Sequence, residues 1–145
     1  MIIRTMLFLT FLWPTYALAE FLWPRGNDFS LTFESIEITK DNERNRAEEI
    51  EFISWLMQAE IEAKFTNNRS TLIVIFITRD NDLFELICTQ SVGSTYQCVD
   101  KENPDGGRYT YNIDLLTSFS RLTGIKLHGK DNFIGEKHII EFSIK

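Results

Sequence analysis

The chain has 145 residues, of which 43% are hydrophobic, 13% aromatic and 25% charged. This balance is typical of a folded globular protein and argues against disorder along the whole chain. The formal net charge of −6 at pH 7 argues against nucleic-acid binding, because an acidic surface repels phosphates.

Residues 1–19 have the three parts of a signal peptide. Arg4 supplies the basic start, residues 6–13 supply an apolar core, and Ala17 and Ala19 stand at the two positions that signal peptidase reads. The apolar run is too short to cross a bilayer. We therefore expect this segment to be cleaved and the mature protein to be exported, periplasmic or secreted, without a transmembrane segment. Cleavage leaves 14 basic and 21 acidic residues, a net charge of −7.

The mature chain is expected to begin with an N-terminal arm, residues 20–27, followed by a single globular β-rich domain, residues 28–145. Three large apolar residues of the arm, Phe21, Leu22 and Trp23, are candidates for docking on a partner. The alternative is that the arm packs against the core of the domain.

Two patterns describe the first part of the domain. Apolar residues alternate between Leu31 and Ile38 with one change of phase, which predicts a strand with a bulge near Ser35. Apolar and polar residues also alternate over residues 47–65, which predicts a long strand. The composition of that stretch favours a helix, so the alternative is an α+β fold with residues 46–65 as a long helix on an antiparallel sheet.

The second part of the domain is typical of several short strands. They are predicted over residues 72–77, 83–90, 95–100, 108–113 and 137–144. The first of them is apolar on both faces, which requires cover on both sides and favours two packed layers. Apolar residues at helical spacing predict one short α-helix near residues 114–123, ended by Gly124. The expected fold is mainly antiparallel β, either a two-layer sandwich or a partly open barrel.

Two cysteines are present, and export would place them in an oxidising compartment. If a hairpin turns at Gly93, residues whose numbers sum to 186 face each other, including Ser91 with Thr95 and Cys88 with Cys98. Residues opposed in this way lie within disulfide range. We predict a disulfide between Cys88 and Cys98 that staples the hairpin.

No sequence motif specifies catalysis. His128 and His138 lack the spacing of metal ligands, and we expect the first in a loop and the second at the rim of the core. The chain also lacks a nucleophile elbow, a phosphate-binding loop and an EF-hand loop. We therefore assign no catalytic residue, metal or cofactor and favour a non-enzyme, although carboxylates from distant positions leave a hydrolase open.

The stapled hairpin presents a short recognition-like motif. Its candidate partner contacts are Ser91, Gly93, Ser94, Thr95 and Tyr96. Residues 92–96 (Val-Gly-Ser-Thr-Tyr) resemble the Ser-Gly-x-x-Tyr loop of periplasmic lysozyme inhibitors, except that valine replaces the serine that enters the target's cleft. This resemblance implies a protein that inhibits a basic partner.

Acidic residues concentrate over residues 34–62, where nine acidic side chains accompany three basic ones. This patch would speed association with a basic partner, although a solvated face that only maintains solubility has the same composition. The main prediction is a small exported binding or inhibitor-type protein that acts on a protein partner. One alternative is a carrier of an apolar ligand, favoured by the 12 phenylalanines. The other is an accessory subunit of a cell-envelope or secretion assembly.

Overall fold

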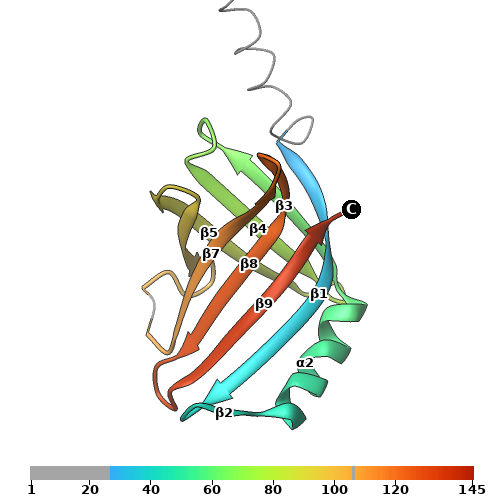
Figure 1. Cartoon of the computed structure of the whole chain (residues 1–145), viewed down its shortest axis with the longest axis vertical. Helices are drawn as coiled ribbons and strands as arrows, with labels where there is room; N and C mark the ends of the chain where they lie inside the picture. The colour runs from blue at the N-terminus through green and yellow to red at the C-terminus, as the bar shows by residue number, and fades with distance from the viewer. Residues whose placement is uncertain (1–26, 106) are drawn as a thin grey trace, which may run out of the picture.

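Eight antiparallel strands close into a barrel in the computed structural model, which describes residues 27–105 and 107–145 (Figure 1). In order around the barrel they are β1 (Asp28–Lys40), β3 (Glu60–Thr66), β4 (Thr71–Ile77), β5 (Leu83–Val92), β6 (Thr95–Asp100), β7 (Tyr109–Ser118), β8 (Arg121–Asp131) and β9 (Glu136–Ile144). The barrel closes because β1 pairs with both β3 and β9. A two-residue strand, β2 (Glu43–Arg44), pairs with the end of β1.

This closed barrel replaces the predicted two-layer sandwich or partly open barrel, although the prediction of a mainly antiparallel β fold is confirmed. The apolar strand β4 shows why the expectation of two layers was wrong. Its residues Leu72, Val74 and Phe76 point into the barrel and are at most 2% exposed. The intervening isoleucines are half-buried on the outer wall, and all the described strands belong to one sheet. Partial cover of these outer isoleucines by neighbouring side chains therefore suffices, and β4 needs no second sheet packed on its outer face.

One α-helix, α2 (Arg46–Gln58), lies in the connection between β2 and β3 and beside β1 (Figure 1). Asn45 caps it by accepting a 3.2 Å hydrogen bond from the backbone N–H of Glu48. The predicted strand over residues 47–65 is thus wrong for its first part and right for β3. The alternation of apolar and polar residues continues into the helix. Met57 belongs to the apolar set but is 73% exposed, so the alternation does not mark a buried face there. Helix propensity and the cap prevail there.

The helix predicted near residues 114–123 is wrong. These residues form the end of β7, a tight turn and the start of β8. Phe119 and Ser120 adopt positive φ angles of 51° and 60° in the turn, and the Phe119 side chain is fully exposed. Gly124 does not end a helix. It lies in β8 where an added β-carbon would overlap the carbonyl oxygen of Phe142 on β9.

Two local predictions are confirmed. The pairing of β1 with β9 shifts register between Phe33 and Ser35, which is the expected bulge. Cys88 on β5 is directly opposite Cys98 on β6, and the two form a disulfide. The hairpin register differs nearer the turn, because a bulge pairs Val92 with Thr95.

The signal peptide predicted over residues 1–19 and the docking residues Phe21, Leu22 and Trp23 lie outside the described residues. No helix in the part of the chain that the structure describes is long and apolar enough to span a membrane.

Candidate functional site

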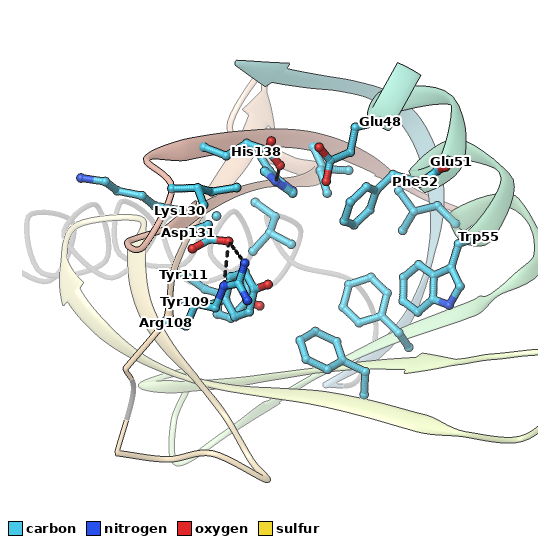
Figure 2. A pocket seen from close by; sticks show the side chains of 18 residues that line it. Glu48, Glu51, Phe52, Trp55, Arg108, Tyr109, Tyr111, Lys130, Asp131 and His138 are labelled. Atoms are coloured by element: carbon cyan, nitrogen blue, oxygen red, sulfur yellow. Dashed lines mark hydrogen bonds and ion pairs between the residues drawn. The ribbon is translucent and has the colours of Figure 1, made fainter. Parts of the chain in front are cut away.

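A cavity of about 550 Å³ lies between α2 and the inner surface of the barrel (Figure 2). Its wall combines residues of the helix with inward-facing residues of β4, β5, β7, β8 and β9. Six aromatic side chains line it: Phe52, Trp55, Phe76, Phe84, Tyr109 and Tyr111. A cavity of this size with mostly apolar walls is typical of a small-molecule site.

The aromatic side chains form a continuous series from the helix across the barrel. Trp55 stacks on Phe76 with ring centroids 5.9 Å apart, and Phe76 lies 5.7 Å from Phe84. Phe84 meets Tyr111 edge-on at 6.1 Å, and Tyr111 stacks on Tyr109 at 6.3 Å. Burial raises the pKa of Tyr111 to about 12, so its hydroxyl stays neutral at physiological pH.

An ion pair between Arg108 and Asp131 lies at one side of the cavity (Figure 2). Two guanidinium nitrogens, Nε and Nη2, each lie 2.9 Å from the same Asp131 oxygen, and the other oxygen accepts from the backbone N–H of Phe133 at 3.0 Å. These bonds hold the pKa of Asp131 below its usual value. The Arg108 guanidinium also lies over the Tyr109 and Phe133 rings, 5.3 and 5.6 Å from their centroids. Its charge is therefore already satisfied within the protein.

A second polar group joins the helix to β9. Glu136 and His138 lie two residues apart on the inner face of β9, and Glu136 Oε1 is 2.8 Å from His138 Nε2. Glu48 on α2 completes the group, since one ligand atom from each of the three residues lies within 4.8 Å of the others. Burial and the adjacent Glu136 carboxylate raise the pKa of Glu48. Phe52 meets the His138 ring edge-on at 4.9 Å.

These three side chains form the one group of described residues that could hold a metal ion by the closeness of its donor atoms. No metal was expected from the sequence, in which this group is not apparent. Glu48 is 88 positions from Glu136, and no local spacing announces their contact. His138 lies on the buried side of its strand, as expected. His128 was expected in a loop but lies in β8, where its Nε2 is 3.0 Å from Asp114 Oδ2.

The predicted partner-binding hairpin is separate from the cavity, because none of its residues lines the wall. Ser91, Gly93 and Ser94 are exposed at the turn, and Thr95 is half-buried. Tyr96 is only 1% exposed, and its hydroxyl donates a 2.6 Å hydrogen bond to the carbonyl oxygen of Arg69. Tyr96 is therefore a core residue, unavailable to a partner at the surface.

The sequence analysis missed the cavity residues themselves. Trp55 was interpreted as part of a strand, and Phe76 and Phe84 fell within two separate predicted strands. The abundance of phenylalanine was the one available signal, and core packing explains such abundance equally well.

No protein-family model matches the sequence, and no curated protein matches it. Among solved structures, a bovine odorant-binding protein in complex with a selenium-containing odorant has 14% sequence identity and a TM-score of 0.50. The match covers 81% of this chain and 72% of the bovine chain. Aphrodisin, a sex pheromone from the female hamster, has 17% identity and a TM-score of 0.46 over the same shares of the two chains. The bovine structure shows that the described part of this chain has a lipocalin-like fold, a closed eight-stranded antiparallel barrel with one short helix.

Proposed function

We propose that this protein is an exported carrier that binds a small apolar ligand in the cavity between α2 and the barrel. The observation that carries this proposal is the cavity of about 550 Å³ with its aromatic wall. Eight-stranded barrels of this type have an interior wide enough for one small ligand. The bovine structure of similar fold holds an odorant, which supports the same use of the barrel here.

The carrier proposal replaces the inhibitor as the main hypothesis. The lysozyme-inhibitor version of that hypothesis depended on a five-residue resemblance that ends at Tyr96, and Tyr96 is buried. Export remains a prediction from residues 1–19, and it suits a carrier that works outside the cell.

Displacement of a neutral fluorescent reporter, N-phenyl-1-naphthylamine, tests the proposal. The oxidised mature protein should bind the reporter with one site per chain, and decanol should displace it. Gly129→Leu should block binding, because a β-carbon at Gly129 fits in contact with Tyr111 and His138, and the added side chain would occupy cavity space.

Gln97→Leu is the matched control, since it adds the same side chain at an exposed position of β6 away from the cavity. The control should bind the reporter like the wild type. Failure of the wild-type protein to bind the reporter or any member of a panel of apolar compounds would reject the carrier function. Equal binding by the wild type and folded Gly129→Leu would place the ligand elsewhere.

A further inference from the structure

We propose that the ligand carries a basic amine, bound as an ammonium group between Glu48 and Glu136, with its apolar body against the aromatic wall. This inference rests on the proposed carrier function and names the chemical class of the ligand.

The charge of the cavity wall favours a cationic ligand. Four carboxylates line the cavity: Glu48, Glu51, Asp131 and Glu136. The two basic residues that line it are Arg108 and Lys130, and Arg108 is held by Asp131 at 2.9 Å. Lys130 is exposed and lies opposite Lys137 in the backbone pairing of β8 with β9. The wall therefore carries an excess of negative charge.

Among the described residues, Glu48 and Glu136 have no basic partner besides an imidazole. No described lysine or arginine lies within 4 Å of either carboxylate, and the close contact of Glu136 is with the His138 imidazole, whose Nε2 lies 2.8 Å from Oε1. The Glu136 side chain is only 5% exposed, so solvent screens its charge weakly. Two neighbouring carboxyl groups in such a place cannot both ionise cheaply. An ammonium group that donates hydrogen bonds to both would relieve their repulsion.

An aromatic surface lies beside the carboxyl groups. Figure 2 shows Glu48, Phe52 and His138 together at one side of the cavity, with Trp55 farther along the helix. Phe52 is in contact with His138, and Trp55 begins the stacked series that continues to Phe76 and Phe84. Aromatic faces attract cations and also accept apolar groups. An amine with a hydrocarbon or aromatic body therefore fits both parts of the wall, whereas a carboxylic acid would meet like charge.

A series of ligands with the same body tests the inference. Decylamine, decanol and decanoic acid are titrated against protein loaded with N-phenyl-1-naphthylamine, at pH 7.5 and with EDTA to remove metal ions. Decylamine should bind at least tenfold more tightly than decanol, and decanoic acid more weakly than decanol. In Glu48→Gln/Glu136→Gln, the ratio of the decylamine affinity to the decanol affinity should fall at least tenfold, because only the amine loses its charged partners.

Glu141→Gln is the matched control, because Glu141 lies on the same strand, outside the cavity wall, and pairs with Lys126. It should keep the wild-type preference for the amine. Equal affinity of the wild type for decylamine and decanol would overturn the inference and leave the carrier function intact. An amine preference that persists in the double variant would also overturn it. No binding of the reporter or of any of the three compounds would reject the carrier function itself.

Discussion

Glu49 accepts a bifurcated hydrogen bond from the single Nε–H of Arg44, with its two carboxylate oxygens at 2.8 and 3.0 Å, and so joins α2 to β2. The Glu49 carboxylate also accepts a 3.4 Å hydrogen bond from the backbone N–H of Ile38 on β1. The residue is only 5% exposed although it carries a charge. Since α2 supplies one wall of the cavity, this contact fixes the wall in place.

Glu49→Gln is expected to destabilise the protein by about 1–3 kcal/mol, because it removes a charge-assisted hydrogen bond from a buried position. Urea denaturation at pH 7 measures the change. Glu51→Gln, an exposed position on the same helix, should change the free energy of unfolding by less than about 0.5 kcal/mol. Equal stabilities of the two variants would mean that the Arg44 contact does not anchor the helix.

The stabilisation by Glu49 should depend on pH in a definite direction. The hydrogen bond from Arg44, and then that from Ile38, lower the pKa of the Glu49 carboxyl below its usual 4.5. A carboxyl whose pKa is lower in the folded state stabilises above its unfolded pKa, and this stabilisation disappears as pH falls through the folded pKa. The stability difference between wild type and Glu49→Gln should therefore be constant above about pH 5.5 and shrink below the usual pKa. A difference that grows on acidification would contradict the assignment.

Gly124→Ala should destabilise the protein by about 3 kcal/mol or more, since its β-carbon would overlap the carbonyl oxygen of Phe142 and push β8 from β9. Gly129→Ala on the same strand is the control. Its β-carbon would meet Tyr111 and His138 side-chain atoms at 3.5–3.6 Å, which is ordinary contact. Thermal unfolding should show a large loss for the first variant and a change below about 1 kcal/mol for the second.

The parts of the fold that local patterns determine could be predicted from the sequence. The pairing of Cys88 with Cys98 follows from a tight hairpin and the constant spacing of opposed residues. The bulge between Phe33 and Ser35 follows from the apolar residues, which alternate with polar ones along the strand and shift by one position at this point. Both depend on neighbours within about ten positions, for which the sequence carries a direct signal.

Barrel closure and the cavity depend on contacts between distant positions. Closure pairs Leu31 with Ile144, and the alternating pattern of each strand is the same in a sandwich as in a barrel. The cavity unites Glu48 and Trp55 of a helix that was predicted as a strand with Glu136 of the last strand. The mistaken strand therefore also concealed the site, because it placed these side chains on a sheet rather than over the barrel interior.

The disulfide between Cys88 and Cys98 should stabilise the fold without shaping the cavity, since neither residue lines it. Closing a loop of this length contributes about 2–3 kcal/mol in the chain-entropy model. Cys88→Ala/Cys98→Ala should lose about that much in urea denaturation and still bind N-phenyl-1-naphthylamine with unchanged affinity once folded. Weaker binding by the folded double variant would show that the hairpin contributes to the site.

Two neighbouring residues of α2 should separate binding from stability. Trp55 is 38% exposed and stacks on Phe76 in the cavity wall, whereas Leu56 is 2% exposed and belongs to the core. Trp55→Ala should weaken reporter binding about tenfold and cost little stability, because its loss opens the wall toward solvent. Leu56→Ala should cost about 2–4 kcal/mol by leaving a cavity in the core.

Reporter titration and urea denaturation of the two variants make the comparison. Leu56 also lines the cavity, so a modest loss of reporter affinity is expected in Leu56→Ala as well. The decisive comparison is between the loss of reporter affinity and the loss of unfolding free energy in each variant. Trp55→Ala should mainly lose affinity, and Leu56→Ala should mainly lose stability. If Trp55→Ala unfolded as readily as Leu56→Ala while its folded form bound the reporter normally, α2 would be part of the core rather than a wall of the ligand site.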